Sequence, residues 1–316
     1  MKLINYIPLS IAVVAGRTAW QSFHKGGNYK NPTDNITEDD YNFLSRLFNK
    51  FKHLSVSEHL KYHFVLTEDE YKKIEHLDEG YLLKKKVDNN YFITIDMRFI
   101  LENINDDVIN LIIKELPNIH IRLIKNESYE NTLTLEKGFS KIETENVKVL
   151  YHLDTGVKDY LSFVTLRIKN ISRAMLQELV RHDDFLSPTI KSTRYVLNKE
   201  LKKEDSFITS FPIEHGIITK KYDFERAKRY VKLTGDKETD RMIVLHLEDL
   251  RKLVTSNKPN DIIKYDIPES YLTEGIFTMP IRNLKNMIKL RDSKDALWEF
   301  QEVAKQLKEI YSKIEG

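Results

Sequence analysis

Residues 178–195 (ELVRHDDFLSPTIKSTRY) concentrate side chains that could bind an anion, directly after an apolar helical run. Two arginines, a lysine and a histidine supply positive charge, and hydroxyl and backbone N–H groups add further donors. Such a set suits a phosphate or pyrophosphate. The donors are Arg181, His182, Lys191, Ser192, Thr193 and Arg194. A solvated loop is the alternative, since Asp183 and Asp184 could pair with these arginines and surface charge clusters usually contribute little.

Composition limits the kinds of ligand. The chain has 316 residues, 41% apolar and 31% charged, which is enough to bury the core of one or two domains. Its formal net charge is only +2, so phosphate affinity must come from local clusters, and we expect a nucleotide rather than a nucleic acid. There is no cysteine, which excludes disulfides, thiolate metal sites and a cysteine nucleophile, and we expect no metal. The apolar stretch 11–15 is too short to span a membrane, so we expect a cytoplasmic protein without a membrane partner.

The elements that position the segment can be predicted from hydrophobic periodicity. A strand is expected over residues 161–170, followed by a helix that Ser172 caps. The apolar stripe of this helix consists of Met175, Leu176, Leu179 and Val180. Farther along, helices are expected over 223–233, 238–256 and 282–291 and from about residue 296, with a strand over 274–280.

The first half of the chain contains two regions that differ in composition. Residues 1–66 predict helices over 11–19 and 38–52, then a turn or short helix capped by Ser57 that leads into a strand. Residues 67–160 are rich in lysine, glutamate and asparagine, and they show no obvious chemistry. They still predict a folded region, with strands over 90–97 and 119–125 and a helix over 106–116.

Several motifs in one order resemble the flavin-dependent thymidylate synthase family. The signature is Arg181-His182 followed by SPTIKSTRY. GRTAWQSF and KHLSVSEH upstream, and IKYDIPESY and MPIRNLKNMIKLRDSKDALWEF downstream, are similar to further family motifs. The resemblance covers about residues 8–66 and 161–311.

The resemblance implies an α+β fold with a central, mostly antiparallel or mixed sheet flanked by helices. Residues 1–66 and 161–316 would form the catalytic domain, and residues 67–160 an inserted α/β accessory subdomain. The implied reaction is methylation of dUMP to dTMP, with methylenetetrahydrofolate as carbon donor and NADPH-reduced FAD as hydride source. Family members are homotetramers that share sites between subunits. Because the chain has no cysteine, the thiolate addition used by the unrelated classical synthases is impossible here.

The resemblance also assigns roles to single positions. Arg291 would polarise the uracil, a task that suits a permanently charged planar fork. Substrate contacts are expected from Gln177, Glu178, Ile190, Lys191, Ser192, Thr193, Arg194 and Lys264. FAD contacts are expected from His53, Ser55, Glu58, Arg181, His182, Arg282 and Asn286.

The chain leaves the family pattern at Asp183-Asp184, which replaces one arginine and adds one residue. Two carboxylates near a pyrophosphate repel it, so we expect either that the carboxylates turn away from the cofactor or that another cation offsets the repulsion. Lys264 also stands where many relatives carry arginine, and it lacks the fork. Three interpretations stay open: a working synthase, a related flavoenzyme with another pyrimidine substrate or a hydroxymethylating outcome, and a non-catalytic nucleotide-binding paralogue.

Overall fold

The structure is a computed structural model that describes residues 1–26, 34–77, 82–130, 142–156, 161–212 and 218–315. The chain divides into two compact units. Unit 1 comprises residues 1–168, 182–190 and 275–316, and unit 2 comprises residues 169–181 and 191–274.

The first sheet of unit 1 has the strand order β1-β2-β4-β3. Its strands are β1 (Lys2–Tyr6), β2 (Lys61–Leu66), β3 (Leu82–Val87) and β4 (Asn90–Asp96), and neighbouring strands are antiparallel. Seven helical elements precede or follow these strands and are α1 (Leu9–Trp20), η1 (Phe23–Lys25), α2 (Glu38–Ser45), the π-helical η2 (Arg46–Lys50), the 3₁₀ helix η3 (Leu54–His59), α3 (Glu68–Ile74) and α4 (Met97–Glu102). Two further helices are α5 (Asp107–Lys114) and α6 (Asn118–Ile124).

Residues on both sides of the expected boundary at 66/67 share one core. Strand β2 lies before the boundary and pairs with β4 after it. Tyr62 and Asp34, which come before the boundary, both contact the buried His120: the Tyr62 hydroxyl lies 2.7 Å from Nδ1, and Asp34 Oδ2 lies 2.9 Å from Nε2. Residues 1–66 and 67–124 therefore pack as one body, and the interpretation of 67–160 as an insertion stays a proposal.

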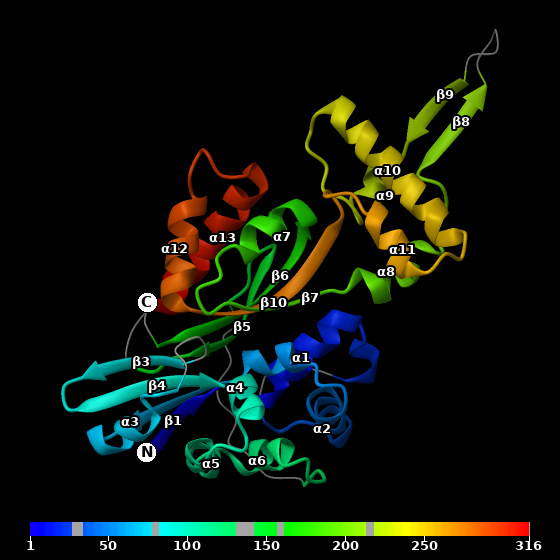
Figure 1. Cartoon of the computed structure of the whole chain (residues 1–316). Helices are drawn as coiled ribbons and strands as arrows, with labels where there is room; N and C mark the ends of the chain where they lie inside the picture. Colours follow the sequence, from blue (N-terminus) through cyan, green and yellow to red (C-terminus); the bar gives the residue numbers. More distant parts are fainter. Residues whose placement is uncertain (27–33, 78–81, 131–141, 157–160, 213–217, 316) are drawn as a thin grey trace. The chain divides into compact units, whose positions relative to one another are not determined.

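The second four-stranded sheet has the order β5-β6-β10-β7. Its strands are β5 (Val147–Leu153), β6 (Phe163–Ser172), β7 (Ser187–Ile190) and β10 (Leu272–Pro280), with β5–β6 and β7–β10 antiparallel. Gly275 pairs with Ile190, and a Cβ on Gly275 would lie only 2.6 Å from Ile190 Cδ1, so any larger residue there would force a neighbouring side chain to move. Helices α12 (Ile281–Arg291) and α13 (Trp298–Glu315) follow β10 and pack side by side in unit 1 (Figure 1).

Unit 2 is mostly helical and has its own core. Its helices are α7 (Arg173–Val180), α8 (Thr193–Leu201), α9 (Phe224–Ala227), α10 (Lys237–Thr255), α11 (Asn260–Ile263) and the 3₁₀ helix η5 (Lys264–Asp266). Strands β8 (Ile208–Pro212) and β9 (Ile218–Tyr222) form a separate antiparallel pair (Figure 1). Leu197, Val244, Leu247 and Tyr271 are among the side chains that fill the core of the unit.

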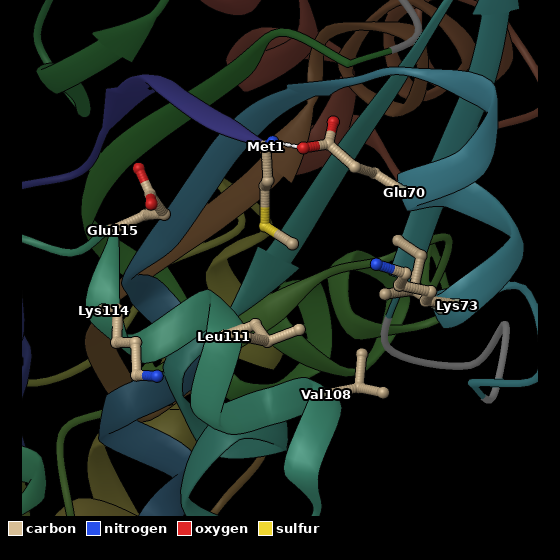
Figure 2. Close-up of a pocket in the computed structure, with 8 residues that line it drawn as sticks. Met1, Glu70, Lys73, Val108, Leu111, Lys114 and Glu115 are labelled. Carbon is tan, nitrogen blue, oxygen red and sulfur yellow. Dashed lines mark hydrogen bonds and ion pairs between the residues drawn. The ribbon is translucent and has the colours of Figure 1, made fainter.

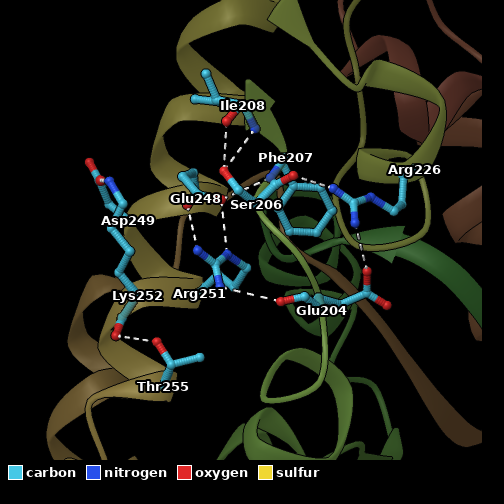
Figure 3. Close-up of polar contacts among 10 residues, drawn as sticks. All are labelled: Glu204, Ser206, Phe207, Ile208, Arg226, Glu248, Asp249, Arg251, Lys252 and Thr255. Atoms are coloured by element: carbon cyan, nitrogen blue, oxygen red, sulfur yellow. Dashed lines mark hydrogen bonds and ion pairs between the residues drawn. The ribbon is translucent and has the colours of Figure 1, made fainter. Parts of the chain in front are cut away.

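The base of the β8–β9 pair is fixed to α10 by a buried carboxylate. Glu248 is only 4% exposed, and its Oε2 accepts the backbone N–H of Phe207 at 2.9 Å. The Arg251 guanidinium donates to both carboxylate oxygens of Glu248, at 2.7 and 3.0 Å, and to the Glu204 carbonyl (Figure 3). Burial raises the pKa of Glu248, but hydrogen bonds from Arg251 and Phe207 outweigh it and lower the pKa below its ordinary value.

The structure confirms the α+β class and most expected elements, and it corrects three details. Residues 119–125 are helical in α6 rather than a strand, because Pro117 precedes the helix and residues 119, 120, 123 and 124 form one buried helical face. Ser57 lies inside η3 and donates to the Leu54 carbonyl, so it is not a cap. Val180 in α7 is 37% exposed, so the buried stripe is shorter than expected.

We predict that Glu248→Ala lowers the free energy of unfolding by about 3 kcal/mol, because it leaves Arg251 and the Phe207 N–H without their buried acceptor. The matched control is Asp249→Ala on the same helix. Among the described residues, Asp249 forms an ion pair only with Lys252, on the surface, so its loss should cost less than about 0.5 kcal/mol. Denaturant unfolding of both variants measures the difference, and equal losses would contradict the anchoring role of Glu248.

Candidate functional site

In unit 1, Arg291 at the end of α12 is held by His182 and Phe300. Arg291 Nε lies 2.9 Å from His182 Nε2, and its guanidinium carbon lies 5.1 Å from the centre of the Phe300 ring. An arginine can only donate, so His182 Nε2 must carry a lone pair, and the imidazole is neutral with its proton on Nδ1. The buried His182 ring meets Phe300 edge-on at 6.0 Å. His182 therefore orients the guanidinium of Arg291.

Arg282 in the first turn of α12 forms a two-pronged ion pair with Asp184. Its Nε lies 2.8 Å from Asp184 Oδ2, and its Nη2 lies 2.7 Å from Oδ1. The side chains are 26% and 46% exposed, so the pair is in contact with water. Asp184 thus does not turn away from the expected cofactor residues but pairs with one of them.

The side chain of Asn283 fixes the backbone between these two contacts. Its amide nitrogen donates to the carbonyl of His182 at 2.8 Å and to that of Asp184 at 2.9 Å. Phe185 follows with a left-handed backbone (φ 51°), and its ring lies 5.7 Å from the Arg282 guanidinium carbon. The structure thus brings together His182, Arg282 and Arg291 of the predicted site. Asn286, also predicted, is exposed one turn after Arg282 on the same helix.

The predicted residues of the segment 53–59 point in different directions. His53 and Ser55 are exposed, and the His53 ring lies 6.1 Å from the Trp20 ring. Glu58 is partly buried and pairs with Arg98 at the start of α4. Burial raises the pKa of Glu58, and the Arg98 hydrogen bond opposes the shift.

Sequence reasoning missed Arg98, which lies in the segment thought to hold no chemistry. Arg98 contacts Glu58 through Nη1 and Glu102 through Nε at 2.8 Å. The i,i+4 spacing to Glu102 was a visible signal, but it indicates only an ordinary helix pair. Nothing in the local sequence connects Arg98 with Glu58, forty residues upstream.

His59 was also missed, and it joins the first half of the chain to the second sheet. It is fully buried, with Nδ1 at 2.8 Å from Thr278 Oγ1 and Nε2 at 2.9 Å from Thr189 Oγ1. A neutral imidazole satisfies both hydroxyls, because each hydroxyl can donate or accept. Burial, aided by the positive charge of Lys61, lowers the pKa of His59 to about 3.

In unit 2, two of the predicted substrate-binding cations, Lys191 and Arg194, already have carboxylate partners. Lys191 Nζ lies 2.9 Å from Glu200 Oε1, and the other oxygen of Glu200 accepts the Tyr271 hydroxyl at 2.7 Å. Arg194 Nε lies 2.7 Å from Asp261 Oδ1, and both side chains are about half exposed.

The remaining predicted residues of unit 2 lie in or next to the terminal turns of its helices α7, α8 and η5. Ser192 is the N-cap of α8 but makes no capping hydrogen bond with its side chain, and Thr193 is the first residue of that helix. Lys264 is exposed, with its Nζ 5.7 Å from the Tyr265 ring. Gln177 donates a hydrogen bond to the Glu269 carboxylate at 2.9 Å. Glu178 and Arg181 form an ion pair with each other, with 3.4 Å between Arg181 Nη1 and Glu178 Oε1. Ile190, in unit 1, lies opposite Gly275.

Three other kinds of feature could point to a function in the described part of the chain: a cavity, a metal site or a membrane-spanning helix. A cavity of about 250 Å³ lies between α3 and α5, and none of its lining residues is a predicted site residue (Figure 2). It is lined by Met1, Glu70, Lys73, Ile74, Val108, Leu111, Lys114 and Glu115. No group of three or more His, Asp or Glu side chains among the described residues could hold a metal ion. None of the described helices is both long and apolar enough to cross a membrane.

In unit 1, contacts with the loop 182–184 orient two guanidinium groups of α12, and groups of this kind can bind anionic or planar polar ligands. The sequence model of the family described as "Thymidylate synthase complementing protein" matches residues 143–315, which is more than half of the chain. The chain belongs to this family. The match includes the signature and α12, but not the segments 16–23 and 52–59 that also resembled family motifs.

Named relatives agree with the family. The chain is 45% identical over 143 residues to a flavin-dependent thymidylate synthase of Campylobacter jejuni, covering 45% of this chain and 62% of the relative. It is 43% identical over 149 residues to that of Wolinella succinogenes, covering 47% and 66%. The chain thus spans just under two thirds of the length of these relatives. A crystal structure of the Helicobacter pylori enzyme complexed with FAD and dUMP aligns over 97% of this chain and 92% of that chain, with 25% identity and a TM-score of 0.40.

The buried His59 predicts acid sensitivity. Its folded pKa of about 3 lies below the ordinary 6.5, so at pH 5 the unfolded chain binds a proton that the folded chain excludes. The contribution of His59 is complete above pH 6.5 and is lost as the pH falls toward 3. At pH 5 the loss is about 2 kcal/mol.

Denaturant unfolding at pH 7.5 and pH 5 tests this prediction. The loss of stability between the two pH values should be about 2 kcal/mol smaller in His59→Asn than in the unmodified protein. His24→Asn, at an exposed position, controls for removal of a histidine as such. An unchanged pH dependence in His59→Asn would show that His59 is not buried in its neutral form.

We also predict that Arg98→Leu lowers the free energy of unfolding at pH 7 by about 2 kcal/mol, because Glu58 loses its charged partner in a partly buried place. Glu102→Gln removes the other, more exposed partner of Arg98 and should cost about 0.3–0.5 kcal/mol. The cost of Arg98→Leu should shrink in acid, where Glu58 becomes protonated. Unfolding curves at pH 7 and pH 4 measure this, and a cost that does not depend on pH would exclude the ion pair as its source.

Proposed function

We propose that the chain catalyses the flavin-dependent methylation of dUMP to dTMP, with methylenetetrahydrofolate as carbon donor and NADPH as reductant. Membership of the family and the names of the relatives support this activity. The observation that carries the proposal within the structure is the orientation of Arg291 by His182 and Phe300. A fixed guanidinium can stabilise negative charge that develops on a uracil without reorganising during the reaction.

The residues of unit 1 fit FAD. Arg282 already donates two parallel hydrogen bonds to one anion, the Asp184 carboxylate, so its fork is placed to donate to a pair of phosphate oxygens. His182, Asn286 and the segment 53–58 would supply further polar contacts. When bound and reduced, FAD supplies the hydride that turns the transferred methylene into a methyl group. The residues of unit 1 proposed to hold FAD are His53, Ser55, Glu58, His182, Arg282 and Asn286, and Arg181, which belongs to unit 2, is proposed for the same cofactor.

The residues of unit 2 fit a nucleotide phosphate. Backbone N–H groups at the start of α8 and the guanidinium of Arg194 are donors of the type that phosphate prefers. Gln177, Glu178, Lys191, Ser192, Thr193 and Lys264 of unit 2 and Ile190 of unit 1 complete the proposed substrate set. In the overall reaction the methylene carbon breaks its bonds to the folate nitrogens and forms a bond to C5 of the uracil, C5 loses its hydrogen as a proton, and the hydride completes the methyl group, which leaves tetrahydrofolate. Polarisation of the ring by Arg291 favours both changes.

A second candidate is a protein of the same fold that binds a nucleotide without this reaction, or that acts on another pyrimidine or hydroxymethylates it. One observation favours it: Lys191, Arg194 and Arg282 each have a carboxylate partner. A purified protein that is yellow, or that becomes yellow with FAD, argues against a non-catalytic paralogue. Product analysis after incubation with dUMP, methylenetetrahydrofolate and NADPH separates methylation from hydroxymethylation.

The assembly and location remain proposals. We expect a homotetramer with shared sites, in the cytoplasm, and a role of residues 67–160 as an accessory insertion. Deletion of roughly residues 70–158 tests the accessory role: unchanged turnover and assembly would confirm it. Unfolding of unit 1, which the core shared with residues 1–66 favours, would contradict it. Sedimentation of the intact chain tests the tetramer.

We predict that the protein restores thymidine-independent growth to a thymidylate-deficient strain and releases tritium from C5-labelled dUMP. Arg291→Ala should slow tritium release at least about 100-fold, the usual cost of losing one oriented charge in a transition state. Lys289→Ala removes an exposed cation from the same helix and should change the rate less than about twofold. Unchanged release in Arg291→Ala would remove this residue from the mechanism.

A further inference from the structure

Asp184 uses the edge of Arg282 that a phosphate would use. The carboxylate meets Nε and Nη2 at 2.8 and 2.7 Å, and a guanidinium binds phosphate through the same parallel pair of hydrogen bonds. A carboxylate and a phosphate cannot both occupy this edge. The ion pair also neutralises the arginine, so its attraction for an approaching anion falls.

The position of Asp184 does not depend on the ion pair alone. Asn283 donates to the carbonyls of His182 and Asp184, and Arg291 donates to His182, so three other contacts hold the loop on α12. The Asp184 carboxylate is therefore presented to Arg282 whether or not the pair is closed. Its effective concentration at the guanidinium stays high, which is the condition for competition with a ligand.

The pair is exposed enough to open. Arg282 and Asp184 are 26% and 46% exposed, and ion pairs in contact with water are weak. A ligand with two or more negative charges can displace a single carboxylate, but the displacement lowers its net affinity. The neighbouring Asp183 is exposed and makes no ion pair among the described residues, so it has no such effect on Arg282.

We propose that Asp184 is an affinity-determining residue: its carboxylate occupies the fork of Arg282 and competes with the phosphate groups of an anionic cofactor. This inference rests on the proposed function in that it takes FAD as the cofactor. It explains why two aspartates can stand in an otherwise anion-binding segment: one of them is an internal competitor, and the other is solvated.

The test compares the dissociation constants of flavin-free protein for FAD, riboflavin and inorganic pyrophosphate. Asp184→Asn should tighten FAD and pyrophosphate binding about three- to fivefold, and it should leave riboflavin, which has no phosphate, unchanged. Asp183→Asn makes the same change of charge one residue away and should alter each constant less than about twofold. Equal effects of the two variants, or weaker FAD binding by Asp184→Asn, would overturn the inference.

A double-mutant cycle with Arg282→Gln assigns the effect to this pair. In the Arg282→Gln background, Asp184→Asn should no longer tighten FAD binding, and an undiminished gain would show that the carboxylate acts elsewhere. Failure of the unmodified protein to bind FAD would count against the proposed function. The pyrophosphate titrations then still decide the inference, because an Asp184→Asn variant that binds pyrophosphate no better than the unmodified protein contradicts it.

Discussion

The two hydrogen bonds from Asn283 to the carbonyls of residues 182 and 184 fix the loop before β7 on helix α12. Buried carbonyl groups need donors, so this amide decides where the loop lies. Once the loop is placed, His182 meets Arg291 and Asp184 meets Arg282. The orientations of both arginines follow from one contact between a loop and a helix.

Charge balance is the second constraint on the site. The chain has 50 lysines and arginines against 48 aspartates and glutamates, and three of the cations expected to bind ligands, Lys191, Arg194 and Arg282, have carboxylate partners within the chain. These pairs stay in contact with water, apart from the more enclosed Lys191. A ligand must therefore exchange one set of charged hydrogen bonds for another, and its affinity reflects the difference between them. The carboxylate partners can therefore change which ligands bind, and how tightly, while the ligand-binding cations stay the same.

The half of the chain outside the family match supports the half inside it. His59 bridges Thr189 of β7 and Thr278 of β10, and Lys61 contacts Ser187 at 3.2 Å. Glu58 is in turn held by Arg98. Because these side chains are buried or partly buried, each needs its partner, and the two halves of unit 1 are joined by polar contacts as well as by the core. The segment before residue 143 thus takes part in shaping the strand that carries the signature.

The sequence alone determined the class of fold, most helices and strands, and the family to which the signature and α12 belong. The periodicity of apolar residues and the capping residues of helices predict these elements from short stretches of sequence. Ser172 is an example, because its hydroxyl accepts a hydrogen bond from the N–H of Met175 as expected for a cap. Local patterns failed at residues 119–125, where apolar residues alternate at 119, 121 and 123 but Pro117 and a buried helical face favour a helix. They also could not connect Glu58 with Arg98 or Asp184 with Arg282. Those pairs lie 40 and 98 residues apart, and only the packing of distant elements decides which opposite charges meet.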